Sequence, residues 1–490
     1  MRSPQVLIVG AGPAGLVAAV TLAKLGVPNL LVERRAQLSQ FPRATGVSVR
    51  SMELLRSWGL ESHVRTGEIR VEPSGWVTRS LAASEGLSVS LGFPTPEDAL
   101  AVSPTTAASV PQDHLEPVLL DHLGRFTETE VQFGTELVGL SQDCDGVTVN
   151  LKDRTGTRQM RVAHVMGADG AHSTVRAAAG ITMSGPDNLT DQLAVLFRAP
   201  LWEHLGGRRF GLYMLQRQPP TVFAPTDHRD RSLFSMPWNP ESESLADHPQ
   251  DGMISLIRQH SGVPDLAVDV LSIGSFTFAA QIAERYREGR LFLAGDAAHR
   301  MTPRGGSGMN TAIADAYDLG WKLGWVHRGW ATPEILDTYE ARRRPIGLRN
   351  VQRSAVSGGE RDSSLDWWDD VRERSPHVWI PDGRSTLDLI GPGFTLLTGP
   401  LGSAWRDLAA HLPGAPVEVH ALDQLTSRQL GLDPDGAVLL RPDATPARSW
   451  SSWTPVLERE LHRTVAIETG RSPADSDRTE RVDAGQPAMT

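Results

Sequence analysis

The sequence has 490 residues and a single cysteine, Cys144. One thiol excludes an intrachain disulfide, a CxxC redox pair and a zinc site built from cysteines. It therefore excludes a disulfide-stapled secreted scaffold, and we expect the protein to work in the reducing environment of the cytoplasm. The sequence predicts no metal site.

Lysine is almost as scarce as cysteine. Only Lys24, Lys152 and Lys322 occur, so 45 of the 48 basic residues are arginines. We attribute this bias mainly to genome composition. It leaves few candidates for a catalytic lysine, because Lys24 and Lys322 fall in predicted helices and Lys152 falls in an exposed strand.

Long uninterrupted apolar runs are also missing. The longest apolar stretch, residues 6–27, is broken by glycines, a proline and a lysine, which is too interrupted for a membrane span. The N-terminus enters a strand directly and shows no basic segment followed by an apolar core, so we expect no secretory signal. The net charge of −10 at pH 7 argues against nucleic acid and anionic membranes as partners.

The overall composition is that of an ordinary globular protein, with 40% hydrophobic and 22% charged residues. This excludes a disordered chain, a collagen and a coiled coil. The length provides enough apolar material for the cores of two or three domains.

The first motif is a glycine loop between a strand and a helix. An apolar run over residues 4–9 ends in Gly10-x-Gly12-x-x-Gly15, and a helical pattern follows. Gly10 permits a tight turn, Gly12 lets the backbone approach a pyrophosphate, and Gly15 lets helix and strand pack closely. The positive end of the helix then faces the phosphates.

An acidic residue completes this dinucleotide-binding motif. A second buried strand over residues 29–32 ends at Glu33, where a carboxylate can hold ribose hydroxyls. Only one such fingerprint occurs in the chain, so we expect one resident dinucleotide. With the single cysteine, this argues against the disulfide reductases that bind two dinucleotides.

The remaining strand and helix patterns predict the domain organisation. Runs over 131–141, 146–152 and 158–166 predict a β-meander, and alternation over 186–285 predicts a mostly antiparallel sheet. The predicted fold class is α/β: a Rossmann-like dinucleotide domain with an inserted antiparallel β-sheet domain, followed by a small α/β unit whose first strand lies near 386–390. The predicted boundaries are 1–180 and 286–360 for the first domain, 181–285 for the insertion, 361–468 for the C-terminal unit and 469–490 for a disordered tail.

A second motif lies at the end of a buried strand over residues 290–294, which runs into Gly295-Asp296. A carboxylate at this point would repel phosphates, so Asp296 is expected to face hydroxyl groups such as those of a flavin ribityl chain. The alternative is that Asp296 is an ordinary helix N-cap.

A third motif, Pro303-Arg304-Gly305-Gly306-Ser307-Gly308-Met309-Asn310, leads into a predicted helix over residues 310–327. Such a loop presents backbone N–H groups at a helix N-terminus, where the N1–C2=O edge of an anionic reduced flavin would be stabilised. The alternative of a flexible glycine linker fits poorly, because both flanks are strongly patterned.

These motifs, in this order, resemble the class A flavoprotein monooxygenases, the FAD-dependent aromatic hydroxylases. The resemblance covers nearly the whole chain and is closest to the branch that acts on polyketide and other polycyclic aromatic natural products. It implies an FAD-binding first domain, a substrate-binding insertion and a thioredoxin-like C-terminal unit. That unit has no cysteine, which excludes a redox role for it.

The resemblance also implies which residues bind the cofactor. Residues 167–176 match the family's DG motif, implied to contact FAD and the incoming NADPH, and Gly295-Asp296 match its GD motif, implied to hold the ribityl chain. Arg43 matches an early FAD contact, and Gln112 matches a glutamine near the pyrophosphate and ribityl group. The expected cofactor-binding set is Gly10, Gly12, Gly15, Glu33, Arg34, Arg43, Gln112, Asp169, Gly170, Gly295, Asp296, Gly308, Met309 and Asn310.

The activity implied is hydroxylation of a planar aromatic or phenolic small molecule, with FAD, NADPH or NADH, and molecular oxygen. A flavin C4a-hydroperoxide is the implied oxidant, and the protein positions the substrate and excludes water. Pro303, Gly305 and Gly306 are expected to line the reactive face of the flavin. His299 has a structural and a catalytic interpretation, and Arg304 is a solvated side chain or a substrate contact. The oligomeric state is left as monomer or homodimer.

Other functions stay open. An antibiotic-inactivating monooxygenase and a Baeyer–Villiger oxygenase would carry the same motifs, and a flavin-binding protein without turnover belongs to a different class. A flavin-dependent halogenase would need a suitably placed lysine, which the sequence does not offer. Large apolar side chains of the insertion form either its core or an apolar roof over the substrate; they are Phe197, Trp202, Phe210, Tyr213, Met214, Phe223, Phe234, Met236, Trp238, Phe276 and Phe278.

Overall fold

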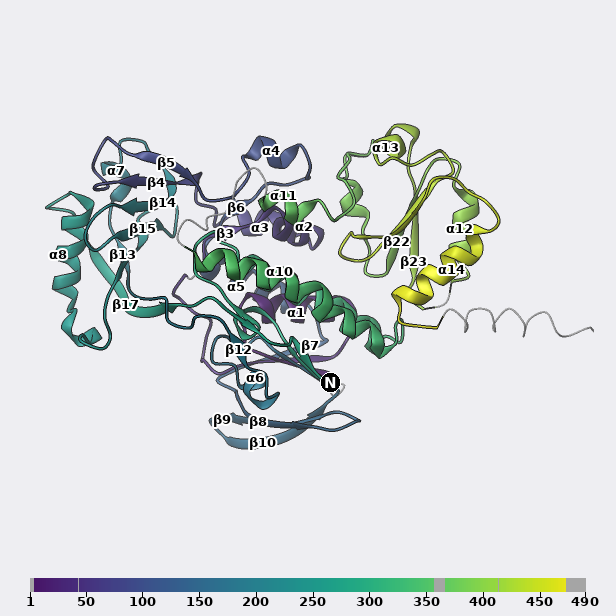
Figure 1. Cartoon of the computed structure of the whole chain (residues 1–490), viewed down its shortest axis with the longest axis horizontal. Helices are drawn as coiled ribbons and strands as arrows, with labels where there is room; N and C mark the ends of the chain where they lie inside the picture. Colours follow the sequence, from purple (N-terminus) through teal and green to yellow (C-terminus); the bar gives the residue numbers. More distant parts are fainter. Residues whose placement is uncertain (1–3, 43, 357–365, 413, 473–490) are drawn as a thin grey trace, which may run out of the picture.

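The computed structural model of the chain describes residues 4–42, 44–356, 366–412 and 414–472 (Figure 1). Arg43 and residues 473–490 of the expected tail lie outside the described residues. A central α/β domain lies between a sheet domain, on the left in Figure 1, and a C-terminal unit, on the right. In the part of the chain that is described, no helix combines the length and the apolar character needed to cross a bilayer.

The central domain is built on a six-stranded sheet in the order β19-β20-β11-β1-β2-β7, parallel except for β19. Its central strands are continuous apolar runs because both faces are covered; all four residues of β1 are buried. The glycine loop therefore leaves the middle of the sheet at the carboxyl end of β1, where open α/β sheets bind ligands. The strands are β1 (Val6–Val9), β2 (Asn29–Glu33), β7 (Thr129–Phe133), β11 (His164–Gly167), β19 (Arg287–Glu288) and β20 (Leu291–Leu293).

Helices pack on this sheet, as the sequence predicts for the stretches after the glycine motifs. The first helix has Pro13 at its first position, where the missing N–H costs nothing. Helices α1, α5 and α9 form one packed group, and α10 lies on α9. The helices are α1 (Pro13–Lys24), α2 (Val49–Ser57), α3 (Glu61–Arg65), α5 (Gln112–Leu123), α6 (Thr174–Ala178), α9 (Gly308–His327) and α10 (Asp337–Ala355), with short 3-10 helices η2 (Gly295–Ala297) and η3 (Pro333–Leu336).

The predicted meander exists, but two of the three predicted runs each span two separate strands. The prediction of one strand over 131–141 is wrong, because Gly134 has φ +65° and turns the chain between β7 and β8. The run over 158–166 likewise divides between β10 and β11, which join different sheets. The small sheets are β8 (Glu136–Gln142) with β9 (Val147–Asp153) and β10 (Gly156–Val162), β3 (Gly46–Val47) with β6 (Ala108–Ser109), and β12 (Met183–Ser184) with β18 (Gln281–Ala283) and β21 (His299–Arg300).

The inserted domain is a seven-stranded, mostly antiparallel sheet in the order β17-β13-β16-β15-β14-β4-β5. Two of its strands, β4 and β5, come from residues 72–90, before the expected boundary at 181, and β4 pairs in parallel with β14. Helix α8 lies on the outer side of the sheet (Figure 1). Helix α4 (Pro96–Leu100), which follows β5, packs against α2 through Ala99 and Val49. The elements of the inserted domain are β4 (Glu72–Thr78), β5 (Leu87–Ser90), β13 (Thr190–Arg198), α7 (Leu201–His204), β14 (Phe210–Leu215), β15 (Thr221–Pro225), β16 (Arg231–Pro237), η1 (Leu245–Asp247), α8 (Gln250–Ser261) and β17 (Asp269–Phe278).

The C-terminal unit has a four-stranded sheet in the order β23-β22-β24-β25, with a parallel pair β22–β23 and antiparallel β24 and β25. This order supports the thioredoxin-like interpretation, which stays a prediction. The strand predicted near 386–390 is wrong: a Ser385–Asp388 capping box starts a 3-10 helix there. Helix α11 (Asp366–Val371) precedes this unit and packs against α2 of the central domain. The elements of the unit are η4 (Thr386–Leu389), β22 (Phe394–Thr398), α12 (Ser403–Ala409), β23 (Val417–Ala421), α13 (Gln424–Gln429), β24 (Ala437–Leu440), β25 (Pro446–Trp450) and α14 (Leu457–Glu468).

Candidate functional site

Two long helices, α1 and α9, run parallel and in direct contact. A Cβ on Gly324 would lie 2.3 Å from Leu25 Cδ1 near their ends. Near their starts, a Cβ on Gly295 would lie 3.5 Å from Ala14 Cβ and 3.2 Å from Ala312 Cβ. The two N-termini, with their positive partial charges, therefore lie side by side, and Gly295 of the second motif separates them.

Neither of these N-termini is capped by a side chain of its own N-cap residue, Gly12 for α1 and Ser307 for α9. Their first-turn N–H groups are thus available to a ligand. The glycine motif leaves room for one: a Cβ on Gly12 would meet no atom within 4 Å, whereas a Cβ on Gly15 would lie 1.8 Å from the carbonyl oxygen of Gly10. The loop is packed tightly below and open above, as a pyrophosphate cradle requires.

The acidic residue of the motif is held beside this cradle. Glu33 Oε2 accepts the backbone N–H of Ala11 at 3.0 Å, and Oε1 accepts that of Arg35 at 2.9 Å. Each carboxylate oxygen retains a lone pair for a ribose hydroxyl. Arg34 is exposed next to it.

The DG motif, Asp169-Gly170, provides a second place where the backbone is open to a ligand. Gly170 has φ +80° and open space around it, and the Asp169 carboxylate accepts the Ser173 hydroxyl at 2.5 Å and the Val175 N–H at 3.1 Å. Burial raises the pKa of Asp169 above its usual value, and these hydrogen bonds oppose that effect. The motif thereby anchors the start of α6.

Arg176 joins the DG and GD motifs. Its guanidinium donates to the carbonyl oxygen of Ala171 at 2.8 Å and to that of Ala297 at 3.0 Å. Asp296 lies beside Ala297 in η2 with an exposed side chain. The alternative of Asp296 as an N-cap is wrong, because the N-cap of η2 is Ala294. Asp296 is thus exposed directly after Gly295, the residue that lies between the starts of α1 and α9.

The third motif forms a loop in front of α9. Gly305 and Gly306 have φ +76° and +56°, a conformation that glycine adopts without strain, and Pro303 and Gly306 are exposed. Gly308 and Met309 begin the helix.

Asn310 fixes this loop to the rest of the domain. Its Oδ1 accepts the Ser48 N–H at 2.8 Å and the Ser51 hydroxyl at 2.9 Å. Its Nδ2 donates to the carbonyl oxygens of Gly46 at 3.0 Å and Gly306 at 3.2 Å. The side chain thus holds the loop by four internal hydrogen bonds, and its contact with the flavin stays a prediction.

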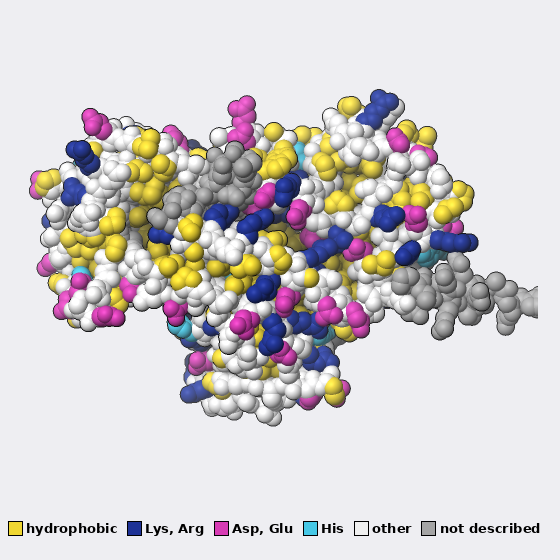
Figure 2. Space-filling model, in the orientation of Figure 1, with side chains coloured by type: hydrophobic (Ala, Val, Ile, Leu, Met, Phe, Trp, Pro, Cys, Tyr) yellow, Lys and Arg dark blue, Asp and Glu magenta, His cyan; other side chains and the backbone are white. Residues whose placement is uncertain are grey.

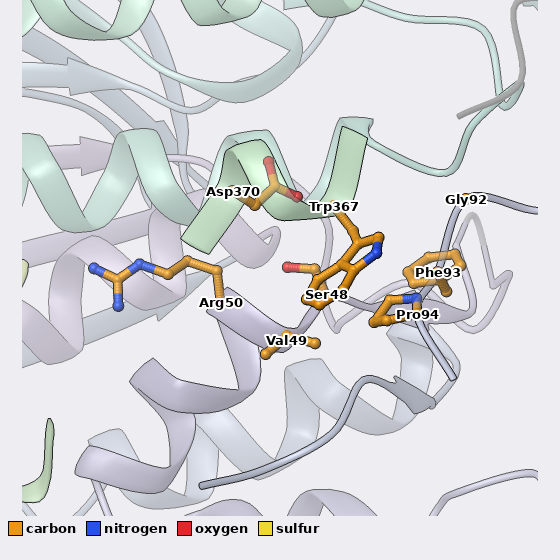
Figure 3. A pocket seen from close by; sticks show the side chains of 8 residues that line it. All are labelled: Ser48, Val49, Arg50, Gly92, Phe93, Pro94, Trp367 and Asp370. Carbon is orange, nitrogen blue, oxygen red and sulfur yellow. The ribbon is translucent and has the colours of Figure 1, made fainter. Parts of the chain in front are cut away.

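The ring of Phe93 lies against Gly46 and against Gly306 of the glycine loop. A Cβ on Gly46 would lie 2.6 Å from Phe93 Cζ, and one on Gly306 would lie 3.4 Å from the same ring. Figure 3 shows Phe93 beside Pro94 at a small pocket that Trp367 of α11 also lines. Sequence analysis missed Phe93 and Trp367, because neither belongs to a recognisable motif.

Gln112 lies at the start of α5, beside the early segment that contains Ala44. Its backbone N–H donates to the Ala44 carbonyl at 2.8 Å, and its side chain donates to Glu116 Oε1 at 2.7 Å. Next to it, Asp113 accepts a bidentate pair of hydrogen bonds from Arg231 of β16, at 2.6 and 3.1 Å. This ion pair ties the inserted sheet to the cofactor domain.

The sheet of the insertion has two different faces, which settles the question about its aromatic residues. Strand partners share a face, so Val195, Phe234 and Phe223 point to the same side, where they pack in one buried cluster with α8. The opposite face carries the residues at alternate positions. Of the large side chains considered above, that face holds Met214, Phe276 and Phe278; the rest belong to or pack against the α8-side core, namely Phe197, Trp202, Phe210, Tyr213, Phe223, Phe234, Met236 and Trp238.

The face away from α8 leads to the glycine loop. A Cβ on Gly75 would lie 2.9 Å from Met214 Cε and 3.4 Å from Leu91 Cδ2. Two residues further, Phe93 lies on Gly46 and Gly306. Leu91 at the sheet wall and Phe93 at the glycine loop thus belong to one short segment, which connects the two.

His299, which has two interpretations, is fully buried. Its Nε2 lies 2.6 Å from Asp315 Oδ2, and Arg343 Nε donates to the other Asp315 oxygen at 2.8 Å. Burial raises the pKa of Asp315, but the Arg343 charge and the hydrogen bonds from Arg343 and His299 outweigh it and hold this pKa below its usual value. This contact supports the structural interpretation of His299.

Comparison with known proteins identifies the family. The family described as FAD binding domain matches residues 3–354. The chain is an FAD-dependent monooxygenase of this family. It is 35% identical to tetracenomycin B2 monooxygenase-dioxygenase of Streptomyces olivaceus, over 92% of this chain and 95% of that one. It is 34% identical to aklavinone 12-hydroxylase of Streptomyces purpurascens, over 90% of this chain and 94% of that one.

Two solved structures are similar throughout. The ternary complex of aklavinone-11 hydroxylase with FAD and aklavinone has a TM-score of 0.85 at 32% identity, covering 96% of this chain and all of that one. The flavin-dependent monooxygenase PieE, in complex with FAD and substrate, has a TM-score of 0.87 at 28% identity, with the same coverage. The expected α/β fold, the FAD cofactor and the monooxygenase activity are confirmed.

Proposed function

We propose that this FAD-dependent monooxygenase uses NADPH or NADH to hydroxylate a planar polycyclic aromatic small molecule in natural-product biosynthesis. The observation that carries the proposal is the apolar wall of the inserted sheet, which faces away from α8 and continues through Leu91 and Phe93 to the glycine loop. A planar, largely apolar ring system is the ligand that such a wall accommodates. The polyketide substrates in the names of the relatives, aklavinone and tetracenomycin, belong to this class.

The residues of the first domain fit FAD. The uncapped start of α1 and the open space over Gly12 would receive the pyrophosphate, Glu33 the ribose, and Asp296 the hydroxyls of the ribityl chain. The uncapped start of α9 would lie at the pyrimidine edge of the flavin. The chemistry supplied by bound FAD is acceptance of two electrons from the nicotinamide donor and activation of molecular oxygen.

The chain's own residues orient the substrate and exclude water. Pro303, Gly305 and Gly306 carry no long side chain, so a flat molecule can approach the flavin edge closely at these positions, while Arg304 between them is half-buried. Phe93 lies directly on this loop and closes one side. Exclusion of water here favours oxygen transfer over release of hydrogen peroxide.

The other candidate functions differ in the pose of the substrate. An antibiotic-inactivating oxygenase and a Baeyer–Villiger oxygenase would use the same cofactor site. The halogenase alternative finds no support, because Lys322 is buried and bound to Asp318 at 2.6 Å while Lys24 and Lys152 are exposed.

We further propose a cytoplasmic protein that acts as a monomer or homodimer.

The proposal is tested by NADPH and NADH oxidation in air, with FAD-loaded protein and a panel of hydroxylated anthraquinones, naphthacenequinones and simple phenols. We expect one polycyclic class to accelerate oxidation, with a product one oxygen atom heavier. A product in which a ring has been opened or expanded into an ester would favour Baeyer–Villiger chemistry. Bound flavin that no compound renders reducible by either nucleotide would contradict the proposal and favour a flavin-binding protein without turnover.

A further inference from the structure

Two buried polar side chains lie in the wall of the inserted sheet that faces away from α8. Gln192 of β13 is 7% exposed and Ser235 of β16 is 6% exposed. Strand register places them on the face away from α8, because Ser235 pairs with Ala194, two residues along β13 from Gln192. They bond to each other: the Ser235 hydroxyl donates to Gln192 Oε1 at 2.9 Å.

The hydrogen bond with Ser235 uses only the amide oxygen of Gln192 and leaves its amide nitrogen free. Among the residues that the structure describes, Gln192 Nε2 has no hydrogen-bond partner. A side-chain amide nitrogen carries two N–H donors. Nε2 of Gln192 is not among the fully buried polar atoms without a partner, so its donors stay accessible from the face of the sheet. Ser235 fixes the orientation of the amide by occupying its oxygen, so the N–H groups are directed elsewhere.

The surroundings of the pair are apolar. Gln192 lies opposite Phe276 of β17 and Pro237 of β16, and Ser235 lies opposite Ala194 and Val222. None of these neighbouring side chains can accept a hydrogen bond from the amide. Gln192 Nε2 is thus a single polar donor in an otherwise apolar surface. Ligand sites are commonly built in this way, with a few polar groups that fix the orientation of an apolar ligand.

We propose that Gln192 is a specificity-determining residue whose Nε2 donates a hydrogen bond to a ring carbonyl of the substrate, with Ser235 holding the amide in place. The inference rests on the proposed function and narrows the substrate class to planar aromatic ketones and quinones. A ring carbonyl is the partner because it is a pure acceptor, whereas the oxygen of a phenol shares its lone pairs with the ring. By anchoring one edge of the ring system, Gln192 selects which carbon lies at the flavin.

Equilibrium binding tests this assignment without turnover. FAD-loaded protein, without nicotinamide, is titrated with hydroxyanthraquinone and with hydroxyanthracene bearing the hydroxyl at the same position, and flavin absorbance and fluorescence report binding. We expect the wild type to bind the quinone about fivefold to tenfold more tightly, the effect of one hydrogen bond. Gln192→Leu should reduce this ratio to within about twofold while retaining affinity for hydroxyanthracene.

Ser235→Ala frees the amide oxygen, so it should lower the ratio by a smaller factor than Gln192→Leu. Gln192→Met serves as a second variant should the branched side chain disturb the sheet. Gln159→Leu, the same change on the exposed strand β10, is the matched control and should preserve the ratio. A wild type that does not discriminate, or a ratio that survives in both Gln192 variants, would overturn the assignment.

The two proposals fail separately. If no compound is oxygenated but the quinone preference depends on Gln192, the proposed hydroxylation fails and the assignment of the carbonyl contact stands. If a substrate is hydroxylated with unchanged regiochemistry and affinity in Gln192→Leu and Gln192→Met, the assignment fails and the proposed function stands.

Discussion

Asn310 and Ser48 are 262 residues apart in the sequence, yet Asn310 Oδ1 accepts the backbone N–H of Ser48 at 2.8 Å. The same amide bonds Gly46 and Gly306. One buried side chain thereby sets the distance between the early segment that leads into α2 and the glycine loop that leads into α9. The loop held in this way, residues 303–310, is the one expected to contact the flavin.

Asn310→Asp should therefore weaken FAD binding. The change keeps the acceptor for Ser48 but removes both N–H donors, leaving the carbonyl oxygens of Gly46 and Gly306 facing a carboxylate. Loss of buried hydrogen bonds of this kind costs about 1 to 3 kcal/mol. We expect the FAD dissociation constant, measured by fluorescence titration of apoprotein, to rise at least tenfold. Asn350→Asp, whose amide donates to Thr311 at 3.1 Å, is the control and should alter FAD binding less.

Gly12 and Gly15 should respond differently to the same substitution. Gly15→Ala places a Cβ 1.8 Å from a backbone oxygen, so it should lower the melting temperature of the apoprotein. Gly12→Ala adds a methyl group where no protein atom lies within 4 Å. It should leave the apoprotein's melting temperature within a few degrees of wild type and weaken FAD binding. Equal thermal destabilisation by both changes would show that the space over Gly12 is not a ligand cradle.

Phe93→Ala should increase uncoupled turnover. The ring lies on Gly46 and Gly306, and its removal opens the glycine loop to water. We expect the fraction of NADPH electrons recovered as hydrogen peroxide to rise at least severalfold with little change in FAD affinity. Phe126→Ala, a partly buried phenylalanine beyond the end of α5, is the control. An unchanged peroxide yield in Phe93→Ala would show that this ring does not shield the reacting groups.

The elements around the glycine motifs could be predicted because their signals are local. A buried strand, a glycine turn and a helix occupy consecutive residues at β1–α1, and Gly305 and Gly306 precede α9 in the same way. The C-terminal 3-10 helix also had a local signal, the Ser385–Asp388 capping box, which the apolar pattern of the segment obscured.

The features that shape the substrate wall depend on contacts between distant segments. Strand β4 joins the inserted sheet by pairing with β14, more than a hundred residues later in the chain. Whether Phe234 or Ser235 faces the cofactor domain depends on which side α8 covers, and alternation alone cannot decide that. The sequence therefore indicated an aromatic-rich sheet without separating its core from its wall.

Two histidines couple the stability of the cofactor domain to pH. His164 of β11 and His327 at the end of α9 lie with Nδ1 and Nε2 3.1 Å apart. Burial, followed by the neighbouring His327 and Arg290, lowers the pKa of His164 to about 3; burial and Arg290 lower that of His327 to about 4. Both histidines are therefore neutral in the folded protein at neutral pH, whereas in the unfolded chain they titrate near 6.5.

Below pH 6.5 the unfolded chain binds protons that the folded chain does not. The two histidines therefore contribute fully to the free energy of unfolding above this pH, and this contribution falls as the pH decreases toward 4. Each histidine contributes a slope of at most about 1.4 kcal/mol per pH unit. We expect urea unfolding at pH 7.5 and 5.0 to show a smaller loss of unfolding free energy in the double variant His164→Gln, His327→Gln than in wild type. His228→Gln, at an exposed loop position, should keep the wild-type loss. An equal loss in the double variant would mean that the pair is not a source of acid sensitivity, because every other titrating group is common to both proteins.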